Sequence, residues 1–136
     1  MPELPPAAPF TWGVRVYWED TDAGGVVYHA SYLRFLERTR SEWLRALGVD
    51  QMTEKREHGL GFVVREMHLD FLRPALLDDE LSVTAHVMQR RAASILFAQT
   101  VVRGDQCLLR AQERVACVDL ALMRPTLIPE RILARF

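Results

Sequence analysis

The sequence has few of the features that mark secreted, membrane-spanning or disulfide-bonded proteins. Only two of its 136 residues are cysteine. Cys107 and Cys117 fall on one predicted strand and would lie roughly 33 Å apart, whereas a disulfide needs Cα atoms within about 7 Å. No apolar run approaches the ~20 residues that cross a bilayer, and the first residues lack the basic start and apolar run of a signal peptide. We therefore expect a cytoplasmic protein without a membrane segment.

No charge of one sign dominates the chain. Seventeen Lys and Arg residues against eighteen Asp and Glu residues leave a net charge of -1, so no positive field favours a nucleic acid partner. The four histidines lack the paired spacing of metal ligands, and we expect no metal site. The composition, 49% hydrophobic and 26% charged, is that of an ordinary globular protein, and the length favours one domain.

The hydrophobic pattern changes period once along the chain. Prolines predict a flexible tail over residues 1–10, ahead of a single domain over residues 11–136. A strand is predicted over 12–18, a glycine-containing loop over 19–25 and an amphipathic helix over 30–47, where apolar residues recur every three or four positions. Alternating patterns then predict strands over 61–72, 80–90, 94–103 and 107–120. This order predicts an α+β fold in which a five-stranded antiparallel sheet wraps around one long helix.

Local signals predict where these elements end. Ser31 is expected to cap the helix, and Gly48 to end it in a left-handed conformation with Val49 adding an apolar contact. The residues Arg103 to Gln106 contain a glycine suited to a tight hairpin turn. The even spacing of the two cysteines predicts that both lie on one buried face of the last strand.

The most specific signal surrounds the loop. It reads Tyr17-Trp-Glu-Asp-Thr-Asp-Ala-Gly-Gly-Val-Val-Tyr-His-Ala-Ser-Tyr-Leu-Arg-Phe-Leu-Glu-Arg. Together with the element order, this segment resembles the hotdog-fold acyl-CoA thioesterases associated with the bacterial Tol-Pal system, relatives of 4-hydroxybenzoyl-CoA thioesterase. The resemblance covers about residues 12–128. It implies a cytoplasmic homodimer or homotetramer, with sheets joined edge to edge and active sites at the subunit interface, that hydrolyses acyl-CoA without metal or cofactor.

The resemblance also assigns roles to residues of the loop. Asp22 matches the family's catalytic carboxylate, and His29 matches the histidine just before the helix. The backbone amides from Tyr28 to Ala30 would face the thioester carbonyl. The residues expected to bind substrate are Gly25, Val26, Tyr28 and Ala30.

Elementary chemistry allows two interpretations of this loop. A carboxylate beside a helix start can attack a thioester or activate water, while unpaired helix N–H groups hold the oxyanion. An Asp close to glycine is also common in turns, where its carboxylate binds local amides. His29 could act on substrate or merely pack at the helix entry. Asp20 is expected to be a solvated or capping charge, and Glu37 is a second-rank catalytic candidate more typical of an ordinary ion pair.

The same residues exclude several other functions. A calcium loop is excluded because Gly24 and Ser31 occupy its fifth and twelfth positions. A phosphatase-type magnesium site would need a parallel α/β core, and a hotdog dehydratase a different pair of histidine and acid. The remaining alternative is a noncatalytic module of the cell-envelope system that binds acyl groups or acyl carrier protein. The expected partners are therefore acyl-CoA, further copies of the chain and acyl carrier protein.

Overall fold

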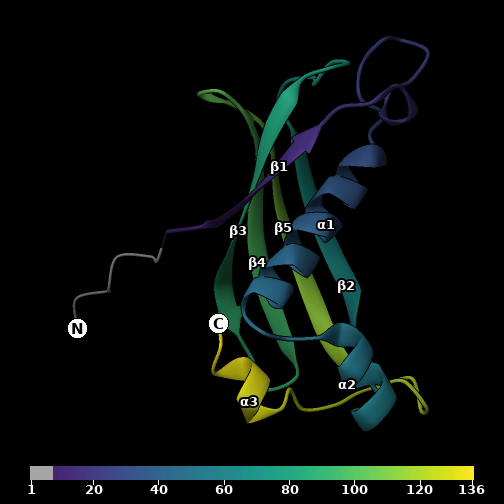
Figure 1. The fold of residues 1–136 in the computed structure, drawn as a ribbon, viewed down its shortest axis with the longest axis vertical. Helices are drawn as coiled ribbons and strands as arrows, with labels where there is room; N and C mark the ends of the chain where they lie inside the picture. The colour runs from purple at the N-terminus through teal and green to yellow at the C-terminus, as the bar shows by residue number, and fades with distance from the viewer. Residues whose placement is uncertain (1–7) are drawn as a thin grey trace.

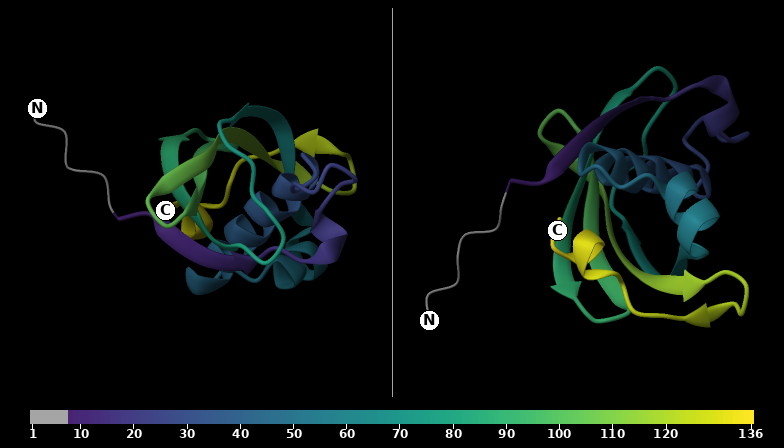
Figure 2. Two further views of the ribbon diagram at one scale, coloured as in Figure 1. Left: turned by 90° about the horizontal axis from the view of Figure 1, so that it is seen from above. Right: turned by 60° about the horizontal axis from the view of Figure 1, so that its bottom comes forward.

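One antiparallel sheet curls around a single long helix in the computed structural model, which describes residues 8–136. The elements are β1 (Phe10–Arg15), the 3-10 helix η1 (Trp18–Asp20), α1 (Ser31–Ala46), α2 (Gln51–His58), β2 (Leu60–Phe71), β3 (Glu80–Arg90), β4 (Ser94–Arg103), β5 (Gln106–Asp119), β6 (Arg124–Pro125) and α3 (Glu130–Leu133). Strands follow the order β1-β3-β4-β5-β2, with β6 beside β5. Figure 2 shows α1 inside the curl. The predicted α+β architecture is confirmed, with the short β6 added to the five expected strands.

The helix α1 forms because its apolar residues fall on one face. Tyr32, Phe35, Leu36 and Leu44 are buried against the sheet. Gly48, with φ of 82°, follows the helix in the left-handed region, and the N–H of Val49 donates to Leu44 O at 2.9 Å. The predicted C-terminal end is therefore confirmed.

The predicted cap at the other end of α1 is wrong. Ala30 already has helical dihedrals and α1 begins at Ser31 itself, so Ser31 lacks the extended backbone that a capping residue needs. Its buried hydroxyl oxygen finds no hydrogen-bond partner among the described residues. The N–H of Ser31 donates instead to Tyr28 O at 2.8 Å, which starts the helical winding before the serine.

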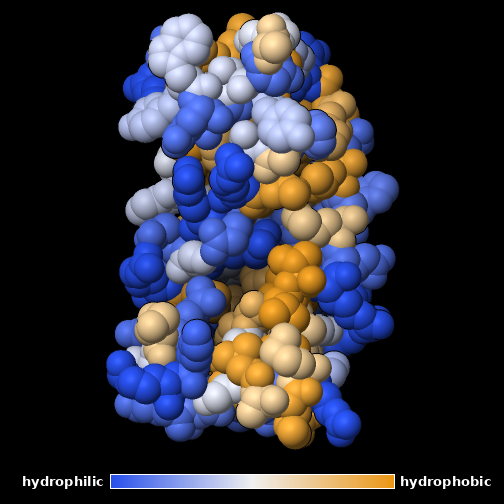
Figure 3. Space-filling model, turned by 90° about the vertical axis from the view of Figure 1, so that its right-hand side faces the viewer, coloured by the Kyte–Doolittle hydropathy of each residue, from blue (hydrophilic) through white to orange (hydrophobic). Residues whose placement is uncertain are grey.

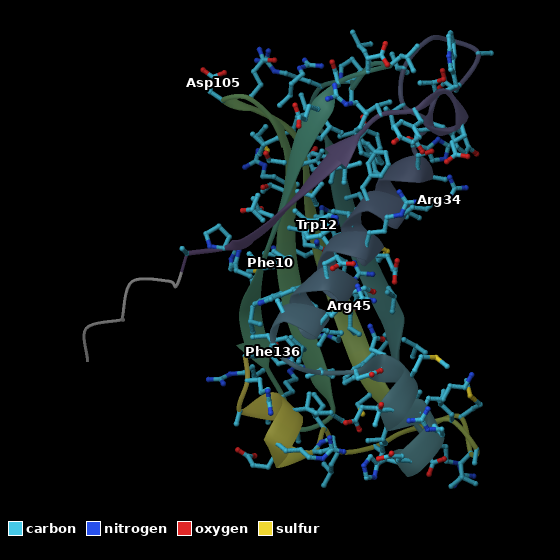
Figure 4. The ribbon with its side chains drawn as sticks, viewed as in Figure 1. Phe10, Trp12, Arg34, Arg45, Asp105 and Phe136 are labelled. Carbon is cyan, nitrogen blue, oxygen red and sulfur yellow. The ribbon has the colours of Figure 1, made fainter. Side chains whose placement is uncertain are left out.

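The first strand differs at both ends from the predicted range of 12–18. Phe10 already pairs with Ala85 of β3 and stacks on Trp12 (Figure 4). The chain leaves the sheet after Arg15, because the carboxylate of Asp20 accepts the Tyr17 N–H at 2.9 Å and winds η1. Of the tail predicted over residues 1–10, residues 1–7 lie outside the described part of the chain.

Two helices after α1 escaped prediction because their sequences show little apolar periodicity. Asp50 caps α2 by accepting the N–H groups of Met52 and Thr53, and Gly59 ends it with φ of 64°. The only buried residue of α2 is Glu54, which forms a two-oxygen ion pair with Arg131 of α3. The ion pair with α3, rather than an apolar stripe, therefore attaches α2 to the rest of the fold.

The cysteines do not share one buried face. Cys117 is buried, but Cys107 is only half-buried, and both thiols are free. The register between β4 and β5 shifts next to Val101 and Val102, which places Leu108 in the core in place of Cys107. An extra residue in one strand reverses the facing of everything before it, so the even spacing misled the prediction.

A layer of buried polar side chains interrupts the apolar core. One apolar cluster surrounds Tyr32 and Phe35, and a second contains Leu44 and Ile95. Arg40, Gln99 and Glu113, all buried, lie at the middle of α1, β4 and β5. Arg40 Nη1 donates to Gln99 Oε1 at 3.0 Å and stands 3.4 Å from Glu113 Oε1. These three residues are called the polar layer below.

We predict that Phe35→Ala lowers the free energy of unfolding by about 3–5 kcal/mol, because it leaves a cavity where a fully buried ring stood. Leu33→Ala, on the exposed face of the same helix, should cost less than about 1 kcal/mol. Urea titration followed by circular dichroism measures both values. Equal losses for the two variants would contradict the packing described.

Stability should also depend on pH through Glu113. Burial raises the pKa of Glu113 from an ordinary 4.5 to about 7, although Arg40 acts to lower it. Above pH 4.5 the unfolded chain releases this proton while the folded chain keeps it, so unfolding becomes easier as pH rises to 7. This group alone should lower the unfolding free energy by about 3 kcal/mol across that window. Urea titrations at several pH values should show that Glu113→Gln removes this part of the slope, whereas the exposed Glu80→Gln keeps it.

Candidate active site

The loop between η1 and α1 is closed by hydrogen bonds between its two arms. Asp22 N–H donates to Val26 O at 2.8 Å, and Gly25 N–H donates to Asp22 O at 3.1 Å. Gly25 has φ of 84°, a conformation that side chains with a Cβ resist. Val26 also bridges to Leu76 on the β2–β3 connection. The loop is therefore an ordered structure at the end of the molecule where α1 begins (Figure 1).

Asp22 is exposed on this loop and held through one oxygen. Its Oδ1 accepts the Gly24 N–H at 2.8 Å, whereas no hydrogen bond to Oδ2 occurs among the described residues. A Cβ at Gly24 would lie only 3.2 Å from Oδ1. This contact fits both a turn residue and an oriented catalytic carboxylate, because the Gly24 amide fixes the Asp22 side chain and leaves Oδ2 open to solvent.

His29 stands beside a hollow at the start of α1. The hollow has a volume of about 250 Å³ and is lined by His29, Val27, Tyr32 and residues 71–74, which follow from the end of β2. The ring of His29 is exposed, and its centroid lies 4.5 Å from that of Tyr28. Asp22 does not line this hollow. The loop therefore brings both predicted catalytic residues to one end of the fold, but only His29 borders the hollow.

Fewer backbone amides at the helix start are free to bind a substrate oxygen than the sequence predicted. The N–H of Tyr28 donates to Asp20 O at 2.8 Å, so it is not available to a substrate oxygen. The N–H groups of His29 and Ala30 make no hydrogen bond within residues 8–136. The oxyanion donors expected from Tyr28 to Ala30 are thereby reduced to two neighbouring amides at the positive end of the helix dipole.

Buried contacts anchor this helix start to the β2–β3 connection. The hydroxyl of Tyr32 accepts the Ala75 N–H at 3.0 Å, and the Val27 N–H donates to Ala75 O at 2.9 Å. Burial raises the pKa of the Tyr32 phenol, partly offset by the Ala75 hydrogen bond and by Arg103. Tyr32 therefore stays a neutral hydroxyl that fixes the position of the first turn of α1.

Asp20 and Glu37, the other acidic residues considered, both make hydrogen bonds within the fold. Asp20 is 4% exposed and caps η1, so its predicted capping role is confirmed and a solvated role is excluded. Glu37 makes no ion pair among the described residues and instead accepts the Ser41 hydroxyl at 2.7 Å. It borders a separate cavity of about 110 Å³ between α1 and β2, further along the helix than the Asp22 loop.

Sequence reasoning missed the polar layer, although a signal for it existed. Gln99 falls between the buried Phe97 and Val101 on β4, and Glu113 falls between buried residues of β5. Polar residues at inward positions of a strand are unusual and require partners. Their partner Arg40 could not be identified without knowing which helix face meets those strands.

Comparisons with known proteins assign the family. A family model described as thioesterase-like superfamily matches residues 16–136. The chain belongs to this superfamily. The acyl-CoA thioesterase YbgC of Haemophilus influenzae is 48% identical over 127 residues, 93% of each chain, and the acyl-CoA thioester hydrolase YbgC of Escherichia coli O6:H1 is 45% identical over 128 residues, 93% of this chain and 95% of that protein.

A solved structure extends the likeness to the fold. The crystal structure of a probable thioesterase from Bartonella henselae is 35% identical and matches with a TM-score of 0.86, covering 90% of this chain and 100% of that one. The predicted hotdog fold and the predicted enzyme class, a thioesterase, are confirmed. Within the described residues, no helix is long and apolar enough to span a membrane.

We predict that Gly25→Ala weakens the loop. The left-handed φ at Gly25 should cost about 1–2 kcal/mol once a Cβ is present. Gly13→Ala in β1 is the matched control, because its φ lies outside that region and no atom lies within 4 Å of the added Cβ. Urea titration should show a larger loss for Gly25→Ala. A loss no greater than that of the control would mean that the loop relaxes freely.

Proposed function

We propose that the protein hydrolyses acyl-CoA to a free acid and CoA, with Asp22 as the catalytic carboxylate. The observation that carries the proposal is the presence, on one loop, of an exposed carboxylate held by Gly24 and of two unpaired amides where that loop enters α1. The relatives named as acyl-CoA thioester hydrolases, at 45% to 48% identity over most of the chain, support the substrate class.

The chemistry follows from these groups. Attack on the thioester carbonyl carbon, by Asp22 or by water that Asp22 deprotonates, places negative charge on the carbonyl oxygen. The N–H groups of His29 and Ala30 would stabilise that oxygen, as oxyanion donors do. The C–S bond then breaks, and the CoA thiolate takes up a proton, for which the His29 imidazole is the predicted donor. Where Asp22 itself attacks, this step leaves an anhydride between the acyl group and Asp22, and water must cleave that anhydride to release the free acid and restore the carboxylate. Gly25, Val26 and Tyr28 would border the bound thioester.

A homodimer completes the proposal. The strand β2 ends the sheet order, so one side of its 12-residue ladder is open. Val63, Val64 and Phe71 on it are 37%, 43% and 50% exposed. Figure 3 shows apolar residues gathered along this side of the molecule. Two copies joined through β2 across a two-fold axis would pair both ladders and cover these side chains. Two such dimers would form the tetramer.

Several parts of the functional assignment stay predictions. They are the cytoplasmic location, the association with the Tol-Pal system, acyl carrier protein as a partner, and the division into a tail over residues 1–10 and one domain over 11–136. The thioesterase relatives favour catalysis over the noncatalytic acyl-binding alternative, which one observation supports. The Asp22 carboxylate has the local amide contact of an ordinary turn residue.

The deciding experiment measures free CoA released from short, long and aromatic acyl-CoA esters. Asp22→Asn keeps the shape and the Gly24 contact but cannot attack or accept a proton, so we expect a fall in kcat of roughly 10²-fold or more. Asp105→Asn is the matched control, since Asp105 is exposed at the tip of the β4–β5 hairpin, away from the loop (Figure 4). Binding of acyl-CoA without CoA release would instead support the binding module.

A further inference from the structure

The polar layer connects α1 to three strands at once. Gln99 on β4 donates from Nε2 to Leu36 O of α1 at 3.2 Å and to Thr84 O of β3 at 3.4 Å, while its Oε1 accepts from Arg40. Arg40 in turn faces Glu113 on β5 at 3.4 Å. One glutamine thus joins the helix backbone, a helix side chain and a neighbouring strand, and one arginine extends the connection to β5.

Glu113 is incompletely satisfied within this layer. It is 0% exposed, and neither carboxylate oxygen makes a hydrogen bond among the described residues. Its cross-strand neighbours are Phe97 on β4 and Met67 on β2, both uncharged, so the charge that faces it is Arg40 from α1. Of the other charged groups on α1, Glu37 acts on Arg40. Proton uptake by Glu113 therefore removes the counter-charge of a single guanidinium.

The layer matters for the site because α1 has few directional attachments. Apolar packing is non-directional and tolerates a small slide of a helix along a sheet. Among the described residues, Tyr32 attaches the first turn of α1 to Ala75 of the β2–β3 connection. At the centre, the polar side-chain contacts with the sheet are those of Gln99 with Leu36 O and with Arg40, and of Arg40 with Glu113. Arg40 lies roughly 14 Å along the helix from Ser31, and a rigid helix transmits a shift over that length.

We propose that Arg40, Gln99 and Glu113 are positioning residues: they set where α1 stands along the sheet, and the charge of Glu113 determines how firmly Arg40 holds it. The catalytic part of this inference rests on the proposed thioesterase function, because the amides at the start of α1 are its oxyanion donors. A displacement of about 1 Å at reacting groups can lower the rate by roughly 10²-fold. None of the three residues needs to touch substrate.

The direction of the pH effect follows from the contacts. With Glu113 ionised, Arg40 is held between Gln99 and a carboxylate, and α1 is fixed. With Glu113 protonated, Arg40 keeps only the Gln99 contact. Because burial raises the pKa of Glu113 to about 7, turnover should decline as pH falls through that value. At low pH the protein would thus be more stable toward unfolding but turn over substrate more slowly.

The first test is the pH profile of kcat and KM between pH 5.5 and 9. We expect the kcat of the unmodified protein to fall about tenfold from pH 8 to pH 6, with KM changed less than about threefold. Glu113→Gln, which carries no charge at any pH, should show the low kcat throughout and no inflection near pH 7. Glu42→Gln, which removes a half-buried carboxylate that pairs with Arg45 on the same helix, should keep the inflection.

A persistent inflection in Glu113→Gln that disappears in His29→Asn would assign the pH effect to His29 and overturn the inference. A second measurement does not depend on turnover. Hydrogen exchange of the amides in residues 28–36, corrected for the intrinsic effect of pH, should be faster at pH 6 than at pH 8 in the unmodified protein and equal in Glu113→Gln. Equal protection at both pH values in the unmodified protein would also overturn it. Absence of CoA release with the expected exchange result would reject the proposed function alone.

Discussion

The enclosure of α1 by the curled sheet is the constraint on which the other features depend. The apolar face of α1 is enclosed by the curled sheet, and Phe35 and Leu36 at its centre are fully buried there. The start of that helix is thereby fixed near the end of β2 and the β2–β3 connection. The loop that precedes it must then reach back to β1, which explains the winding of η1 around Asp20 and the left-handed Gly25.

The candidate site combines rigidity with exposure. The loop that contains Asp22 is closed by backbone hydrogen bonds and tied to Ala75 and Leu76, so it needs no partner chain to be ordered. Asp22 and His29 are nevertheless open to solvent on one copy of the chain. Thioester hydrolysis benefits from exclusion of bulk water around the developing charge. In the proposed homodimer, a second copy joined along the open ladder of β2 would cover part of this surface.

The polar layer costs stability that an apolar core would not lose. Burying a charged pair is commonly neutral or unfavourable compared with hydrophobic residues of the same volume, and here burial dominates the pKa of Glu113 while it lowers that of Arg40. Polar contacts have direction, however, and apolar contacts do not. Under the proposed function, in which the amides at its start hold the oxyanion, α1 gains from a directional attachment at its centre, even at the expense of stability.

The sequence by itself determined the order of the long helix and the five main strands, the helix end at Gly48, the β4–β5 hairpin and the motif around Asp22, because periodicity and turn chemistry are local properties of the chain. It also indicated the family through a long continuous resemblance. Only the tertiary structure decided that Leu108 replaces Cys107 in the core, that Asp20 takes the Tyr28 amide, and that Arg40, Gln99 and Glu113 meet. Each of these facts depends on strand register or on contacts between residues distant in the chain. The spacing of neighbouring side chains encodes neither the register nor the distant contacts.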